Sequence, residues 1–270
     1  MTEPTAKPDP VLPDWAKKPF EEFLDHQDDL ARILHMSMGG ISMLRGRYQA
    51  IKVLKEIDAE GEETAELERA ARERELAQKE VDNDFPLIHE QATVFLWGSL
   101  EALVRSFAAS WFGNKPEVWR HDAVKKIRVR LGDYEALDPA DRCLWVIDLL
   151  DQDAAGPLRA GVTRFETLLQ PLGLTGAFSE DGSKTLFELS QVRHVIMHRR
   201  GMADRRLIDA CPWLSLAAGD RVRISHDMWQ RYNAAVGEYV LELIQRVREA
   251  FGLKRYVPKH DAARNGDRSV

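Results

Sequence analysis

The side chains best suited to chemistry are an arginine and two histidines near the end of a predicted helix over 183–198. His194 and His198 are four residues apart, so on a helix they share one face at a spacing compatible with a metal ion. The HExxH pattern of zinc proteases is absent, and no Asp, Glu or Cys stands out as a third ligand. We therefore expect no metal and no cofactor here.

Arg193 belongs to the same predicted helix and falls inside its apolar arc, which consists of Leu186, Leu189, Val192, Ile196 and Met197. A guanidinium in that position is costly unless another group compensates its charge. Glu101 is the only charged side chain in QATVFLWGSLEALV, residues 91–104. We expect Glu101 to pair with Arg193, either as an ion pair that fixes helix register or as part of a catalytic site.

The elements that must position these residues are helices. Apolar residues recur at three- and four-residue spacing over 30–54, and Gly61 is expected to end that helix. Residues 62–82 are helix formers with opposite charges one turn apart, so the two segments predict a charged helical hairpin. Asp84 is expected to cap a helix that starts at Pro86. The remaining helices are predicted from Asp138 and over 162–169, 183–198 and 229–247.

One segment carries a β signal. WLSL and RVRIS alternate apolar and polar residues on either side of the turn-like AAGD, which predicts a small β-hairpin at 213–225. The fold class is mainly α. In chain order we expect a flexible N-terminal arm at 1–19, the charged helical hairpin at 20–84, one helical domain at 85–254 and a flexible tail at 255–270.

Cysteine content and hydropathy bear on localisation. The two cysteines cannot form a disulfide framework, and no disulfide partner is expected. The N-terminus lacks the apolar stretch of a signal peptide, and no apolar run approaches the length needed to span a bilayer. We therefore expect a cytoplasmic protein that has no membrane partner.

A family resemblance rests on SQVRHVIMHRRGMAD, residues 190–204. Arg193 followed after four residues by His198 resembles the R-x4-6-H motif of the HEPN superfamily of α-helical ribonucleases. Gly201 and Asp204 are similar to the segment that follows the motif in the RiboL-PSP-HEPN-like subset. One difference is His194, where that family often has a small polar residue.

Other segments are similar to that subset as well. These are the acidic helix WGSLEALV, the segment GDRVRIS and the tyrosine-bearing last helix. The resemblance is concentrated in 186–250, is weaker from about 86, and does not include the N-terminal third. It implies that 85–254 forms a helical bundle of HEPN type.

The resemblance also implies an activity, metal-independent cleavage of RNA through attack by the 2′-hydroxyl. In that mechanism His198 is the general acid or base, Arg193 stabilises the phosphate, and His194 assists. The family usually dimerises, so two chains would supply both acid and base at one homodimer interface. RNA is the expected substrate, the expected role is that of a toxin or defence effector, and an antitoxin or defence partner is also expected.

Charge distribution is relevant to an RNA partner. The chain has 38 Lys and Arg against 44 Asp and Glu, a net charge of −6. Residues 56–84 hold twelve acids and four bases, so the rest of the chain is slightly basic. Basic residues gather at 120–130 and 199–206, and Lys125, Lys126, Arg199 and Arg200 are the candidate RNA-binding residues. Either cluster also fits an ordinary solvated helix face.

Two other interpretations remain open on the sequence. The first is a non-catalytic helical module of HEPN type that binds RNA, a nucleotide or a partner protein. The second is a scaffold or membrane-surface protein that uses the charged hairpin. The combination of Arg193, His198 and an inward-facing Glu101 favours the ribonuclease.

Overall fold

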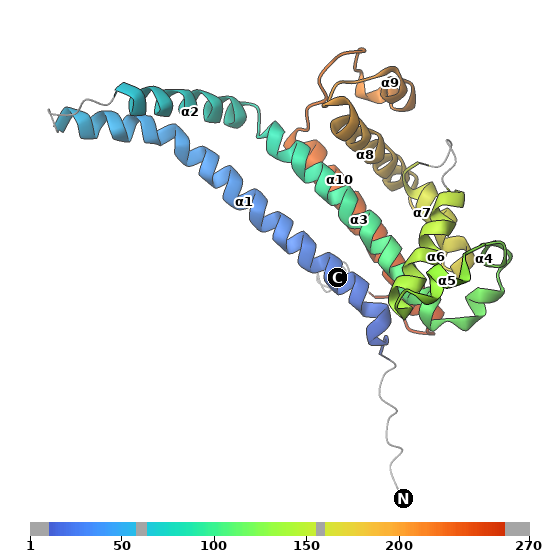
Figure 1. The fold of residues 1–270 in the computed structure, drawn as a ribbon. Coiled ribbons are helices and arrows are strands. Elements are labelled where there is room, and N and C mark those ends of the chain that lie inside the picture. Colours follow the sequence, from blue (N-terminus) through green and yellow to red (C-terminus); the bar gives the residue numbers. More distant parts are fainter. Residues whose placement is uncertain (1–10, 58–63, 155–159, 257–270) are drawn as a thin grey trace, which may run out of the picture. The chain divides into compact units, whose positions relative to one another are not determined.

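The computed structural model describes residues 11–57, 64–154 and 160–256, and within these ranges the protein is all α (Figure 1). The α-helices are α1 (Asp14–Ile57), α2 (Thr64–Asp82), α3 (Pro86–Asn114), α4 (Asp122–Lys125), α5 (Leu131–Glu135), α6 (Pro139–Ala154), α7 (Val162–Leu169), α8 (Glu180–Arg199), α9 (Arg205–Ala210) and α10 (His226–Ala250). Three short 3-10 helices are η1 (Pro116–Arg120), η2 (Gln170–Leu172) and η3 (Pro212–Leu214). No helix in the described ranges is both long and apolar enough to cross a membrane.

The described chain forms two compact units, each assembled from segments that are far apart in the sequence. The first unit contains the described residues up to Glu22, then Ala102–Gly182, then those from Gly237 onward. The second contains Phe23–Glu101 and Ser183–Val236. Helices α1, α3, α8 and α10 each contribute to both units. All residues of the predicted catalytic set belong to the second unit.

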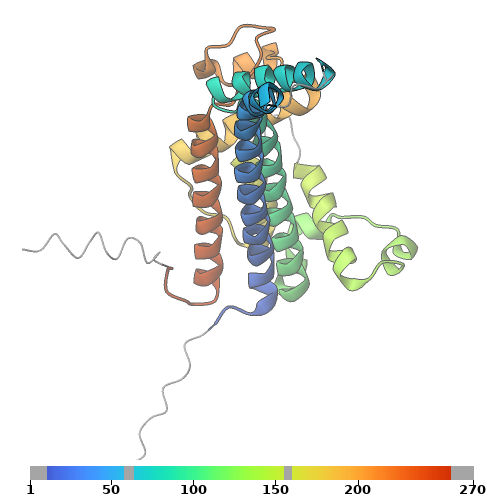
Figure 2. The same ribbon diagram turned by 90° about the vertical axis from the view of Figure 1, so that its left-hand side faces the viewer.

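In the first unit, the first turns of α1 pack against the last turns of α3 (Figure 2). The rings of Phe20 and Phe107 are 5.1 Å apart, and those of Trp15 and Trp111 are 5.7 Å apart. Phe107 is fully buried. Burial of these aromatic side chains explains why the helix begins early in the chain.

Each terminal segment that was expected to be flexible includes described residues that make defined contacts. The arm was expected to reach residue 19, but α1 begins at Asp14 and its first turns are packed. At the other end, Tyr256 exchanges backbone hydrogen bonds with the side chain of Gln245. Residues 1–10 and 257–270 lie outside the described ranges.

Helices α1 and α2 form the predicted charged hairpin in the second unit. Arg47 Nη1 lies 2.6 Å from Glu73 Oε2, and the guanidinium of Arg74 lies 5.5 Å from the ring centroid of Tyr48. α1 ends at Ile57, and the expected end at Gly61 lies outside the described residues. Polar side chains thus join two helices that have few apolar residues to share.

The predicted β-hairpin at 213–225 is wrong. The described residues contain no strand, only an isolated antiparallel bridge between Met202 and Arg221. WLSL is not extended, because η3 winds its first residues and Ser215 takes a left-handed backbone with φ of 53°.

The segment RVRIS is extended, but it pairs with a different part of the chain. Val222 N donates to Gly201 O at 2.8 Å, and Ala203 N donates to Asp220 O at 2.7 Å. Val222 and Ile224 are buried, so the alternation in the sequence reflects one buried face. Periodicity found the extended segment but could not identify its partner.

Asp84 was expected to cap α3, but it does not. Its carboxylate accepts a hydrogen bond of 3.0 Å from His226 N at the start of α10. At the start of α3, Glu80 Oε2 instead accepts a hydrogen bond of 3.2 Å from Leu87 N. Asp84 therefore connects two helices of the second unit that are remote in sequence.

Candidate functional site

Arg193 lies at the edge of the second unit's core and faces Glu101, as the sequence predicts. Its Nη2 is 3.7 Å from Glu101 Oε2, and the side chains are 28% and 29% exposed. This separation is that of an ion pair rather than a hydrogen bond. Arg193 Nε is buried and has no hydrogen-bond partner among the described residues. Glu101 thus orients the guanidinium, while Arg193 keeps a donor for another acceptor.

His194 and His198 lie one turn apart near the end of α8, with their rings close together. The ring centroids are 4.8 Å apart, and the planes are tilted by 47°. His194 is half-buried and His198 is exposed. Burial lowers the pKa of His194, and the positive charges of Arg206 and His198 lower it further. His194 is therefore neutral at physiological pH, and its ring can accept a proton.

Helix geometry turns Arg193 and the histidines toward different sides of α8. Arg193 and His198 are separated by about 140° around the helix axis, whereas His194 and His198 are separated by about 40°. Val192 and Val195, which flank Arg193 and His194, are buried. One copy of α8 therefore presents the guanidinium and the imidazoles on adjacent surfaces rather than at a common point.

The end of α8 is rich in arginine. Arg199 Nε lies 3.3 Å from Asp204 Oδ2, and Asp204 Oδ1 caps α9 by accepting from Leu207 N at 2.9 Å. Arg200 leaves the helix with a left-handed φ of 56° and is exposed. Arg205 and Arg206, on the first turn of α9, are exposed too. The arginines of the predicted basic cluster are thus exposed. They lie where α8 ends and α9 begins, two helices that adjoin in the chain (Figure 1).

Lys125 and Lys126 lie in the first unit, at the end of the one-turn helix α4. Both are exposed, and Lys125 Nζ lies 3.3 Å from Asp122. Trp119 precedes them, is 46% exposed and packs on Phe112 with ring centroids 4.5 Å apart. Lys125 and Lys126 are therefore accessible to solvent, and their position is defined relative to the first unit only.

Sequence reasoning missed a buried carboxylate on α8. Glu188 is only 1% exposed and accepts hydrogen bonds from Tyr232 at 2.7 Å, from Trp213 Nε1 and from Arg231. Burial and the negative charge of Glu188 raise the pKa of Tyr232. A sequence signal did exist, because at 100° per residue Glu188 projects between Val192 and Val195 on α8, and both of these are buried.

A second unpredicted cluster joins α3 to α10. His89 and His226 approach to 3.5 Å between Nε2 and Nδ1, and Glu90 Oε2 lies 2.9 Å from Arg221 Nη2. His89 and Glu90 are almost fully buried. Burial lowers the pKa of His89, with a further contribution from His226. The neighbouring Asp84 opposes this shift, and the cluster is best explained as the polar contact that fixes the start of α10.

Neither cysteine is activated for nucleophilic chemistry. Burial raises the pKa of the Cys143 thiol. Burial together with the charge of Glu188 raises the pKa of Cys211 to about 12. Both thiols are free and protonated at neutral pH. Within the described ranges, no three His, Cys, Asp or Glu side chains gather as a set that could hold a metal ion.

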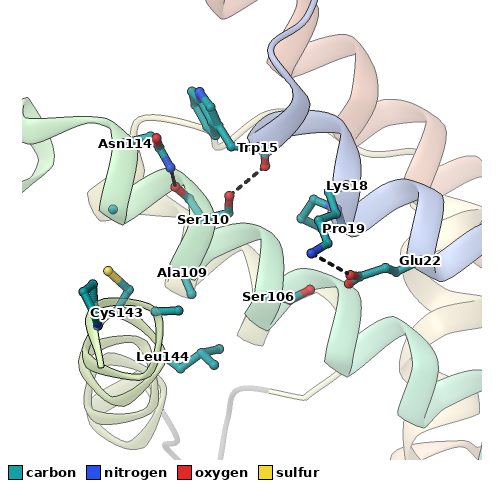
Figure 3. A pocket seen from close by; sticks show the side chains of 13 residues that line it. Trp15, Lys18, Pro19, Glu22, Ser106, Ala109, Ser110, Asn114, Cys143 and Leu144 are labelled. Carbon is teal, nitrogen blue, oxygen red and sulfur yellow. Dashed lines mark hydrogen bonds and ion pairs between the residues drawn. The ribbon is translucent and has the colours of Figure 1, made fainter. Parts of the chain in front are cut away.

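A pocket of about 560 Å³ lies in the first unit, lined by residues of α1, α3 and α6 (Figure 3). Ser110 Oγ donates to Trp15 O at 2.7 Å on one wall, and Lys18 pairs with Glu22 at the rim. Cys143 and Leu144 face it from α6. None of the predicted site residues lines it, and its lining shows no acid–base pair or nucleophile.

Comparison of the chain with protein-family models, with curated proteins and with solved structures found no match. The function is therefore inferred from the histidines and arginines at the end of α8 and from the acid–base and phosphate chemistry of these side chains.

Proposed function

We propose that the protein is an endoribonuclease that cleaves RNA without a metal ion. A base removes the proton of the 2′-hydroxyl, the 2′-oxygen bonds to phosphorus, and the bond to the 5′-oxygen breaks as an acid protonates that oxygen. The products are a 2′,3′-cyclic phosphate and a 5′-hydroxyl. The observation that carries the proposal is the paired His194 and His198 at an arginine-rich helix end, one face away from Arg193.

Each residue has a role that its environment supports. His198 is exposed and can reach a bound strand, so we assign it as the general acid or base. His194 is held neutral, which suits proton acceptance or a hydrogen bond to His198. Arg193 carries a permanent positive charge that stabilises the phosphoryl oxygens in the transition state.

The reaction needs an acid and a base, and a homodimer supplies both. If the ends of two α8 helices face each other across a two-fold axis, the His198 of each chain meets its counterpart, and the two Arg193 side chains flank the phosphate. In this arrangement Arg193 and His198 of one chain need not point the same way, because His198 would act with the His198 of the other chain and Arg193 with the other Arg193.

Substrate binding would use the exposed arginines around α8. Arg199 and Arg200 adjoin His198 in the chain, and phosphate contacts from such residues supply affinity that is independent of sequence. Lys125 and Lys126 are candidate RNA contacts of the first unit by itself. A toxin or defence effector, controlled by an antitoxin, is the biological setting that this activity suits.

The test is incubation of labelled RNA with wild type, His198→Ala and His35→Ala in the presence of EDTA. His35 is an exposed histidine on α1, remote in sequence from the site, and serves as the matched control. We expect wild type and His35→Ala to cleave and to leave a cyclic phosphate end, and His198→Ala to lose at least a hundredfold in rate. Equal cleavage by all three proteins, or none by wild type across several RNAs, refutes the proposal.

A further inference from the structure

Trp213 is an aromatic side chain held in a fixed position at the surface of the second unit. Its ring remains 39% exposed, although its indole Nε1 donates a hydrogen bond to the buried Glu188. Lys184 Nζ lies 4.4 Å from the centroid of the same ring. The carboxylate fixes the ring edge, so the exposed part of the ring is preorganised for contact.

Two positively charged side chains lie near the ring, Lys184 against it and Arg231 on the carboxylate that the indole also binds. Lys184 is exposed, and the side chain of Arg231 is 48% exposed while it shares Glu188 with Trp213. Glu188 balances one of these charges inside the fold, but it is only 1% exposed and is turned away from solvent. A ligand that approaches Trp213 therefore meets an aromatic side chain with two cations in its neighbourhood.

We propose that Trp213, Lys184 and Arg231 form a subsite that stacks one base of the single-stranded RNA cleaved at His198. The inference rests on the proposed function. Every nucleobase has a π face that can stack on an indole, whereas the two nearby cations contact the phosphates before and after that base. The subsite thus binds RNA without selecting a particular base.

The position of the subsite along α8 supports this assignment. Lys184 and His198 are both on α8, and their fourteen-residue separation corresponds to roughly 21 Å along the axis and about 40° around it. They therefore share one face of the helix. Arg206, on the first turn of α9, lies close enough to His194 to lower its pKa. The separation of about 21 Å is within reach of a few nucleotides, so a strand bound at His198 can place another base at Trp213.

The experiment measures binding of labelled dinucleotide and hexanucleotide RNA to catalytically inactive His198→Ala protein, alone and combined with Trp213→Leu, Trp213→Phe or Lys184→Ala. Phe95→Leu is the matched control, because Phe95 is a 41% exposed aromatic residue of the same unit. Circular dichroism checks that each variant is folded.

For the hexanucleotide we expect Trp213→Leu to weaken binding about tenfold, the scale of removing one base–aromatic stack. Trp213→Phe should retain most of the affinity, because the ring remains. Lys184→Ala should reduce the salt slope by about 0.7, the value for one phosphate contact on a single strand. The dinucleotide is too short to occupy His198 and the subsite together, so its affinity should be lower than that of the hexanucleotide in the Trp213-containing protein, and this difference should shrink in Trp213→Leu.

Unchanged hexanucleotide affinity in Trp213→Leu, or an unchanged salt slope in Lys184→Ala if the tryptophan variants do not fold, overturns the subsite. Equal weakening by Phe95→Leu also overturns it, because the loss would then not depend on this position. Cleavage by wild-type protein separates the two proposals. Cleavage without an effect of Trp213 leaves the nuclease and removes the subsite, whereas a Trp213-dependent hexanucleotide complex without cleavage removes the nuclease alone.

Discussion

At the scale of single residues, two charged side chains lie on the buried side of α8, and they differ in exposure and in how fully they are hydrogen-bonded. Glu188 is fully enclosed and satisfied by three donors, so it is a structural group of the core. Arg193 is a quarter exposed, is only loosely paired and has a buried Nε without a partner in the described residues. A loosely paired guanidinium is suited to a ligand, whereas a saturated carboxylate is not.

Replacement of Glu101 by Gln tests whether the ion pair serves catalysis. The pair is partly solvated and longer than a hydrogen bond, so its loss should reduce the free energy of unfolding by about 1 kcal/mol or less. Cleavage should fall more than tenfold, because Arg193 loses the charge that orients it. Urea unfolding and cleavage rates measure the two effects.

Asp148→Asn is the matched control, because Asp148 pairs with Arg105 at the surface of the first unit. It should have a similarly small effect on stability and none on cleavage. Full stability together with full activity in Glu101→Ala would show that the pair has neither role.

At the scale of elements, the proposed RNA-binding surface depends on how α8 ends. Arg200 and Gly201 take left-handed backbones, and Gly201 N reaches Val195 O at 3.1 Å, which turns the chain sharply toward α9. Asp204 then caps α9 and pairs with Arg199. The turn therefore places Arg199, Arg200 and the arginines of α9 around the histidines.

Charge reversal of Arg199 and Arg200 to Glu should weaken RNA binding and reduce its dependence on salt. Each cation that no longer neutralises a phosphate of a single strand lowers the slope of log affinity against log salt by about 0.7. Titrations at several salt concentrations measure this slope. Arg69→Glu with Arg72→Glu, on the exposed surface of α2, makes the same charge change elsewhere and should leave the slope unaltered. An unaltered slope in the α8 variant would remove both arginines from the RNA-binding surface.

At the scale of the whole molecule, net charge conceals a local contrast. The chain carries −6 overall, yet the acids of residues 56–84 account for all of this excess. RNA contact would therefore be local, driven by the arginines around α8 rather than by the field of the entire protein. A two-fold dimer would double that local charge in one cleft.

The dimer can be tested by mixing chains. The protein should sediment at twice the 30.8 kDa chain mass. Coexpression of wild type with an excess of His198→Ala should lower the cleavage rate per wild-type chain several-fold, because mixed dimers contain one His198 instead of two. The same excess of His35→Ala should leave the rate unchanged. A rate per wild-type chain that is independent of added His198→Ala would show that one chain is sufficient.

The sequence alone determined what depends on local periodicity. The spacing of apolar residues located most of the helices, including α7 and α10, to within a few residues, and it placed His194 beside His198 on one face. The pairing of Arg193 with Glu101 was also foreseeable, since each interrupts an apolar stretch and opposite charges compensate each other.

The tertiary structure decided which distant segments meet. Residues 220–222 pair with 201–203, just after α8, instead of with WLSL. Asp84 accepts a hydrogen bond from the start of α10 instead of capping α3, and Trp213 donates a hydrogen bond to Glu188. Helical periodicity shows which face of a segment is apolar but not what covers it, because the partner is selected by packing across many residues of intervening chain. For that reason the proposed acid–base residues were visible in the sequence, whereas the proposed stacking subsite was not.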